Sequence, residues 1–251
     1  MVKHIDWMMV SGGFCAIIYV ESEFVDSISQ NFLLKSILCK INQMIYEKGT
    51  KSEKDREGKS IMIKNTVTYF EKPGKDNTEN TLKLAVNAAK ELGIRNIVLA
   101  TTEGNTAKMM ADSIPHDNIT VTVVTHAFGQ KKPNCNPMPA ELRKYLIEKG
   151  FQVCTAAHAL SGAERSLSTT FSGIYPVEII AHTLRMFGQG TKVCVEISAM
   201  AADAGYILTD EPVIAIGGTV RGADTALVLR PQVSCNVLKT KIDRVICMPI
   251  E

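Results

Sequence analysis

The feature that most constrains this chain is an alternation, from Thr66 onward, of short β-branched apolar runs with segments of helical period. The runs predict strands at 66–70, 96–101, 119–125, 151–155, 212–216, 225–229 and 244–248. The intervening segments predict helices at about 78–92, 105–113, 139–149, 177–187 and 193–204. Such alternation favours a largely parallel sheet with helices on both faces. Little helical sequence separates the strands after Pro212, so at least one of them is expected to run antiparallel.

The ends of several helices also have a sequence signature. Asp76 or Asn77 is a candidate N-cap for the first helix, and Glu79 is placed to complete a capping box. Pro139 is expected to be the first residue of the third helix. The segment Val193–Ile197 fits a strand as well as a helix, and the pattern alone does not decide between them.

Composition excludes several classes of protein. The net charge of +2 gives no electrostatic footprint for nucleic acid, and no apolar run reaches the roughly 18 residues of a membrane span. The seven cysteines are odd in number and form no C-x-x-C motif, so neither a disulfide framework nor a zinc site is indicated. Cys154 and His158 are four residues apart, but two side chains do not make a metal site. We therefore expect a cytoplasmic protein with reduced cysteines, which does not bind nucleic acid or membranes and contains no metal.

Residues 1–61 do not share the α/β pattern and are treated as an extension to a single domain at 62–251. Residues 47–60 contain nine charged side chains among fourteen, a linker composition, and 31–46 fits a short amphipathic helix. The apolar run from Trp7 to Val20 allows a signal or membrane-surface segment. The alternative hypothesis is a misassigned start, with translation beginning at Met62, because Arg56-Glu57-Gly58 can be encoded by a purine-rich stretch before it.

Ligands of such folds bind beyond the carboxyl ends of the strands, so the residues that follow each strand are the candidate site. After the second strand come Thr101, Thr102, Glu103, Gly104, Asn105 and Thr106. Their hydroxyl groups, glycine and helix N-terminal N–H groups suit a phosphate, although a simple helix-capping turn explains the same residues. Neither a P-loop nor G-x-G-x-x-G occurs in the chain.

Three further strand ends carry polar residues. His126 and His158 follow two strands, and each is either a catalytic group or a structural histidine. Ser161 and Arg165 lie near a helix start, where Arg165 binds a phosphate or pairs with a carboxylate. Glycines and polar side chains also meet in one loop, which favours ligand binding over a plain hairpin: Gly217, Gly218, Arg221, Asp224 and Thr225.

Carboxylates are the last candidates. Glu196 and Asp203 are seven residues apart on one face of a helix, which fits an acid/base pair or a solvated stripe. The segment Glu71–Gly74 ends the first strand and is expected to line the same edge. Neither G-x-S-x-G nor H-E-x-x-H is present, so no motif specifies a reaction.

Four groups of residues together resemble a known family. They are Tyr69–Gly74 with Asn77-Thr78, Leu160–Gly162 with Glu164–Ser166, Val193–Ile197 with Met200–Asp203, and Gly217-Gly218 with Arg221–Thr225. In combination they resemble stand-alone prokaryotic proteins of the pyruvate kinase alpha/beta (C-terminal) domain family. The resemblance covers about Thr66 to Pro249 and does not extend to residues 1–61.

The resemblance implies a three-layer α/β/α sandwich with a mostly parallel sheet, and a phosphorylated ligand such as flavin mononucleotide in the cleft. In pyruvate kinases a similar turn binds the phosphate of a sugar-phosphate effector, and Thr101, Thr102, Gly104, Asn105 and Thr106 match it in form. This chain has Glu103 where those enzymes typically have serine, and a carboxylate there repels a phosphate unless it points away. The chain lacks the catalytic barrel of pyruvate kinase, so pyruvate kinase activity is not expected.

The leading hypothesis is therefore a protein that binds a phosphorylated small molecule at the carboxyl edge of the sheet. One alternative is an enzyme that uses His126 or His158 with Glu196 or Asp203 in the same cleft. Another is a regulatory or assembly module, which would form a homo-oligomer.

Overall fold

The computed structural model describes residues 2–10, 13–20 and 65–250. The chain divides into two compact units, Met1–Lys64 and Asn65–Glu251. In the first unit, β1 (Val2–Val10) and β2 (Gly13–Val20) pair antiparallel, with Val10 opposite Gly13. Most of the apolar run from Trp7 to Val20 lies in this hairpin. The amphipathic helix, the linker and the start site at Met62 expected from the sequence lie outside the described residues.

The second unit contains one seven-stranded sheet with the order β3-β9-β8-β7-β4-β5-β6. Its strands are β3 (Thr68–Phe70), β4 (Asn96–Ala100), β5 (Thr120–Thr125), β6 (Gln152–Thr155), β7 (Val213–Gly217), β8 (Thr225–Arg230) and β9 (Lys241–Pro249). Only β8 runs against the others, pairing antiparallel with β7 and with β9. The expected antiparallel strand after Pro212 is thus confirmed, and the carboxyl ends of the remaining strands share one edge.

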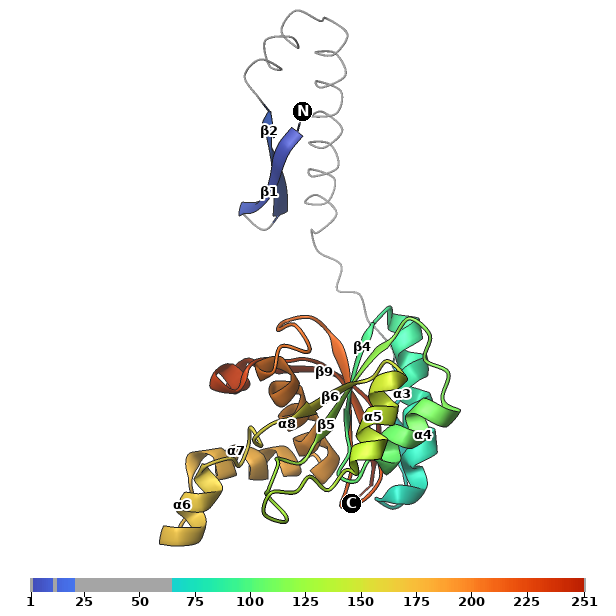
Figure 1. The fold of residues 1–251 in the computed structure, drawn as a ribbon, viewed down its shortest axis with the longest axis vertical. Helices are drawn as coiled ribbons and strands as arrows, with labels where there is room; N and C mark the ends of the chain where they lie inside the picture. The colour runs from blue at the N-terminus through green and yellow to red at the C-terminus, as the bar shows by residue number, and fades with distance from the viewer. Residues whose placement is uncertain (1, 11–12, 21–64, 251) are drawn as a thin grey trace, which may run out of the picture. The chain divides into compact units, whose positions relative to one another are not determined.

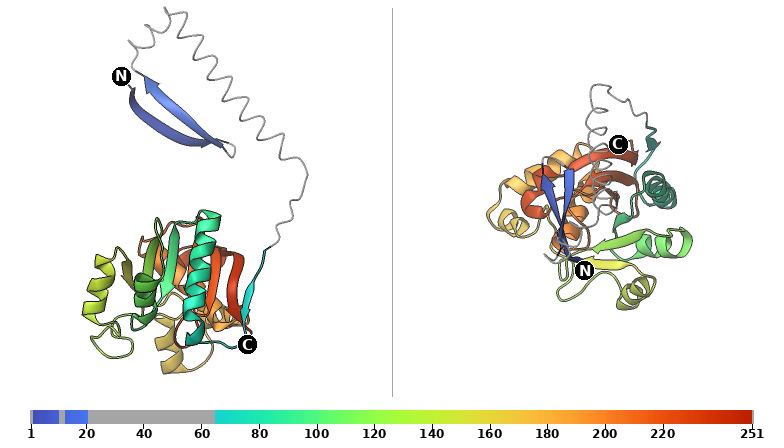
Figure 2. Two further views of the ribbon diagram at one scale, coloured as in Figure 1. Left: turned by 90° about the vertical axis from the view of Figure 1, so that its right-hand side faces the viewer. Right: turned by 90° about the horizontal axis from the view of Figure 1, so that it is seen from above.

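Helices cover both faces of this sheet, which confirms the three-layer α/β/α arrangement (Figure 1). The helices of the second unit are α3 (Thr78–Leu92), α4 (Asn105–Ser113), α5 (Ala140–Glu148), α6 (Glu164–Phe171), α7 (Pro176–Arg185) and α8 (Gln189–Asp203). Two short 3-10 helices, η1 (Lys75–Asn77) and η2 (Ser234–Lys239), complete it. Figure 2, in its left panel, looks onto the face that α3, α4 and α5 cover.

Helix α8 lies on the opposite face and settles the ambiguous segment. Val193–Ile197 is helical, so the strand alternative is wrong. Nearly every residue of α8 from Gly190 to Ala202 is buried, because β4, β7, β8 and α7 all pack against it. A helix buried on all sides loses the polar face that gives helical periodicity its signal, and a short window of it then resembles a buried strand.

Two expected helix ends differ from the structure. No side-chain cap forms at Asn77; instead the Thr78 hydroxyl donates a hydrogen bond to the Lys75 carbonyl (2.6 Å) and accepts one from the Ala223 N–H (3.1 Å). A contact with a loop 145 residues away replaces the local capping box. Pro139 precedes the first helical residue by one position, a shift within the ordinary uncertainty of helix ends.

Candidate functional site

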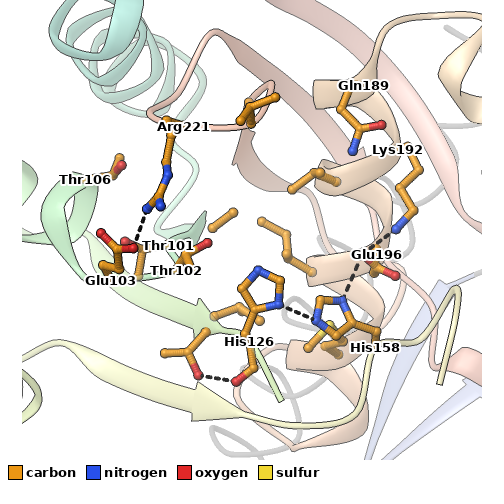
Figure 3. A pocket seen from close by; sticks show the side chains of 18 of the residues that line it. Thr101, Thr102, Glu103, Thr106, His126, His158, Gln189, Lys192, Glu196 and Arg221 are labelled. Atoms are coloured by element: carbon orange, nitrogen blue, oxygen red, sulfur yellow. Dashed lines mark hydrogen bonds and ion pairs between the residues drawn. The ribbon is translucent and has the colours of Figure 1, made fainter. Parts of the chain in front are cut away.

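A cavity of about 310 Å³ opens at the carboxyl edge of the sheet, beyond β4, β5 and β7 (Figure 3). Its lining comes from the turns after these strands, from the loop after β6, from the starts of α4 and α6, from the end of α7 and from α8. The connection from β4 leads to α4 on one face, whereas α8 on the other face leads back to β7, so the cavity lies at the topological switch point. This cavity therefore lies at the sheet edge that the sequence selects.

The turn from Thr101 to Thr106 forms one wall. The Thr101 hydroxyl accepts a hydrogen bond from the Gly104 N–H (3.2 Å), and α4 begins at Asn105. Gly104 has φ 96°, and a Cβ there would overlap the Leu142 side chain, so Gly104 shapes the turn and does not itself line the cavity. The first N–H groups of α4 have no partner within the helix, and Asn105 and Thr106, the first two residues of α4, line the cavity together with Thr102.

Glu103 lies in this wall and is paired with the facing loop. Its Oε1 lies 2.5 Å from the Nη1 of Arg221, with side chains 43% and 55% exposed. The carboxylate therefore does not point away from the cavity, but an arginine compensates its charge. In this state Arg221 binds the protein's own carboxylate at the position where the sequence predicts a ligand contact.

The loop after β7 brings Gly218 and Arg221 to the cavity, together with the exposed Val220. Val220 has φ 59°, a strained conformation for a β-branched residue. Gly217, Asp224 and Thr225, which the sequence places among the ligand-binding residues, do not line the cavity.

Asp224 has a structural position instead. It is fully buried, and its Oδ2 accepts hydrogen bonds from the N–H groups of Gly74 (2.9 Å) and Thr219 (3.1 Å). The Thr225 hydroxyl donates to its Oδ1 (2.8 Å). The carboxylate thus joins the loop after β3 to the loop after β7. The segment Glu71–Gly74 is fixed by this contact and does not line the cavity.

The opposite wall contributes basic side chains. Ser161 and Arg165, which the sequence selects as candidate ligand-binding residues, line this wall, together with Arg185 and Lys192. Sequence reasoning missed Arg185 and Lys192. Lys192 lies four residues before Glu196 in α8, a spacing that identifies an ion pair once the segment is known to be helical.

The floor carries a histidine network, by which we mean Lys192, Glu196, His158, His126 and Gln130. Within it, the Glu196 carboxylate lies 2.6 Å from Lys192 Nζ and 3.3 Å from His158 Nδ1. His158 Nε2 lies 3.0 Å from His126 Nδ1, which also lies 3.0 Å from Gln130 Oε1. Figure 3 shows the network running from α8 to the centre of the cavity.

Burial and the contacts within the network shift the pKa values of three of its residues. Burial raises the pKa of Glu196, but hydrogen bonds from His158 and Lys192 and the charge of Lys192 outweigh burial and lower this pKa to about 2. Burial lowers the pKa of Lys192, opposed by Glu196. Burial also lowers the pKa of His126, opposed by the hydrogen bond to Gln130. Glu196 is therefore ionised and His126 neutral at pH 7.

Asp203 does not join this network. Its Oδ1 accepts a hydrogen bond from the Ser234 N–H (2.8 Å) at the far end of α8, so its pairing with Glu196 in an acid/base site is wrong. Seven residues of helix return to the same face but advance about 10 Å along the axis. Helical spacing predicts a shared face and not a shared cavity.

Metal binding finds no support among the described residues, where no cluster of three or more histidine, cysteine, aspartate or glutamate side chains is placed around a possible ion. Of the described cysteines, Cys154, Cys194 and Cys247 are buried and Cys135 and Cys235 exposed, all as free thiols. No described helix is long and apolar enough to cross a bilayer.

Fold and cavity together define a three-layer α/β domain with a binding cavity at the switch point of its sheet. Residues 79–229 match the family described as "Pyruvate kinase, alpha/beta domain", which is more than half of the chain, so the chain belongs to that family.

Solved structures similar to the chain include three described as pyruvate kinase from Cryptosporidium parvum, one of them in complex with ADP. Their sequence identities are 17%, 18% and 19%, with TM-scores of 0.32, 0.34 and 0.31. The matches cover 62%, 62% and 66% of this chain but only 22%, 24% and 22% of those chains. The chain therefore spans less than a quarter of the length of these pyruvate kinases.

Proposed function

We propose that this protein binds a phosphorylated small molecule in the cavity at the carboxyl edge of its sheet, and that it has no pyruvate kinase activity. The observation that carries the proposal is the meeting of separate loops at one cavity with donors for an anion. Four basic side chains line it against two carboxylates: Arg165, Arg185, Lys192 and Arg221 against Glu103 and Glu196. His126 is neutral and adds no charge, so basic side chains outnumber acidic ones in the cavity.

The two walls suit different parts of such a ligand. The start of α4, with the hydroxyl groups of Thr102 and Thr106, offers N–H and O–H donors to a phosphate. Arg165 on the facing wall offers a forked donor that matches phosphate oxygens in pairs. We therefore place the phosphate between the start of α4 and Arg165.

The size and lining of the cavity bear on the rest of the ligand. A volume of about 310 Å³ is at the lower end of the roughly 300–1,000 Å³ typical of small-molecule sites. Its described lining contains no phenylalanine, tyrosine or tryptophan. These features favour a compact phosphorylated compound over flavin mononucleotide, which nevertheless belongs in any test because the family resemblance implies it.

The test is a thermal-shift panel of inorganic phosphate, sugar phosphates, nucleotides and flavin mononucleotide, followed by calorimetric titration of the compounds that stabilise the protein. A specific ligand at a hundred times its Kd stabilises the folded state by about 2.7 kcal/mol. Bound flavin would also show in the absorption spectrum of the purified protein. No stabilisation by any compound at saturation contradicts the proposal, and pyruvate formation from phosphoenolpyruvate and ADP contradicts its second part.

A matched pair of variants locates the binding site. Arg165→Ala removes a charged donor from the cavity and is expected to weaken binding roughly 10- to 100-fold. Arg95→Ala removes an exposed arginine just before β4, at the opposite edge of the sheet, and is expected to leave the affinity unchanged. Equal effects of the two variants would place the ligand elsewhere or show only a general charge effect.

A second candidate function is an enzyme that acts on this ligand. It is favoured by one observation: His126 in the cavity contacts the half-buried His158, which in turn contacts the buried carboxylate of Glu196. The inference below develops what that arrangement can do.

A further inference from the structure

The histidine network contains a consistent set of hydrogen-bond donors and acceptors. Glu196 is ionised and accepts hydrogen bonds only, so the Nδ1 of His158, 3.3 Å away, carries a proton. His158 Nε2 lies 3.0 Å from His126 Nδ1, so one of these two nitrogens carries the proton of this contact.

Gln130 assigns that proton to His126. Its Oε1 is an acceptor and lies 3.0 Å from the same Nδ1 of His126. With the opposite tautomer, the Nδ1 lone pair of His126 would face this oxygen. The Nδ1 proton of His126 is therefore shared between Gln130 Oε1 and His158 Nε2, and since His126 is neutral, its Nε2 is unprotonated.

That free nitrogen belongs to a residue that lines the cavity. Figure 3 shows the ring of His126 between the wall of Thr102 and the ring of His158, with one edge directed into the cavity. The network therefore ends at the cavity in a proton acceptor, and its other end is a carboxylate whose side chain is only 4% exposed.

We propose that this cavity is a site of proton transfer as well as of anion binding: His126 accepts a proton at Nε2 from the phosphorylated ligand, and His158 and Glu196 are positioning residues that carry the resulting charge. The proposal rests on the binding function proposed above and adds a requirement for the ligand. The ligand must present a proton donor, such as a protonated phosphate oxygen, next to His126.

The step balances with the groups present. The phosphate binds as its monoanion: its O–H bond breaks, the electron pair stays on the oxygen and leaves the dianion, and a new N–H bond forms at Nε2 of His126. The Nδ1 proton of His126 then moves to Nε2 of His158. The positive charge ends on His158 beside the Glu196 carboxylate, which stabilises it. No electrons are exchanged, so the step needs neither an oxidant nor a reductant.

The charges around His126 set the direction of this transfer. Burial is the largest influence on the pKa of His126 and lowers it, as does Lys131, whereas the hydrogen bond to Gln130 and the charge of Glu196 raise it. The free protein therefore presents a neutral, proton-accepting His126 at pH 7. Further cationic groups lie around Glu196 and the cavity: Lys192, Arg165, Arg185 and Arg221. A ligand anion offsets these positive charges and raises the pKa of His126, so binding and proton uptake are coupled.

Calorimetric titration with inorganic phosphate tests the coupling. At pH 8, where phosphate is mostly a dianion, titrations in two buffers of different ionisation enthalpy give the number of protons taken up on binding. We expect roughly one proton per phosphate for the wild-type protein. His126→Asn should abolish the uptake, and Glu196→Gln should reduce it. The control His182→Asn, at an exposed position of α7, should leave it unchanged.

The outcomes separate this inference from the proposed function. Phosphate binding without proton uptake, or with uptake that persists in His126→Asn, overturns proton transfer and leaves anion binding standing. Absence of phosphate binding counts against the proposed function and against this inference with it. Nitrogen-detected NMR of the five histidines is a further test that needs no ligand, because it shows which ring nitrogen of His126 carries a proton. A proton on Nε2 of His126 in the free protein at pH 8 would overturn the inference alone, whereas a proton on Nδ1 supports it.

Discussion

Replacing Glu196 by glutamine tests the energetics of the buried network most sharply. The pKa of Glu196 is about 2 in the folded protein, against an ordinary value of 4.5. Since one pKa unit corresponds to 1.36 kcal/mol, the ionised carboxylate contributes about 3 kcal/mol to folding at pH 7. Glutamine keeps an oxygen for the Leu160 N–H, at 3.1 Å in the wild type, but leaves the ammonium of Lys192 buried without a counter-charge. We expect Glu196→Gln to lower the free energy of unfolding by about 3 kcal/mol at pH 7.

The pH dependence follows from the direction of the shift. The folded-state pKa is depressed, so the contribution is complete above pH 4.5 and is lost as the pH falls toward 2. The difference between wild type and variant should therefore shrink to about 1 kcal/mol at pH 3. Urea unfolding at pH 7, 5 and 3 measures it. The control is Glu148→Gln, which breaks an exposed i,i+4 pair with Lys144 and should cost under about 0.5 kcal/mol. A difference below about 1 kcal/mol at pH 7, or one that does not change with pH, would refute the reasoning.

Two further variants test a close backbone approach near the cavity and an ion pair in its wall. Gly217→Ala places a Cβ 2.6 Å from the Gly190 carbonyl oxygen, where β7 crosses the start of α8. This variant should lower the free energy of unfolding, measured by chemical denaturation, by about 1–3 kcal/mol. An unchanged denaturation midpoint would contradict this close approach. Glu103→Gln releases Arg221 from its ion pair and removes a negative charge from the cavity. Calorimetry should therefore show that phosphate binds roughly two- to fivefold more tightly. Weaker binding would contradict this and show that Glu103 positions Arg221 for the ligand.

The sequence was informative wherever local pattern decides structure. The β4–α4 turn could be predicted because a buried strand, a glycine and a helix start are adjacent in the chain, and the structure places Thr102, Asn105 and Thr106 at the cavity. The common edge could be predicted because parallel strands have their carboxyl ends on the same side.

What the sequence could not reveal depends on contacts between distant segments. Asp224 has the residue type of a ligand contact, but its carboxylate binds the N–H of Gly74, 150 positions away. No sequence motif marks Lys192 or Arg185 as a binding residue, and only the packing of α7 against α8 brings them to the cavity. Asp203 shares a helical face with Glu196, yet the length of the helix separates them.

Amide NMR with a phosphate titration tests the central claim most directly, because it shows which backbone N–H groups respond to the anion. We predict saturable shifts confined to three segments that are far apart in the chain: 101–107, 160–165 and 217–222. Saturable shifts in only one of these segments, or shifts centred on another surface, would contradict the claim that separate loops form a single site for a phosphorylated molecule.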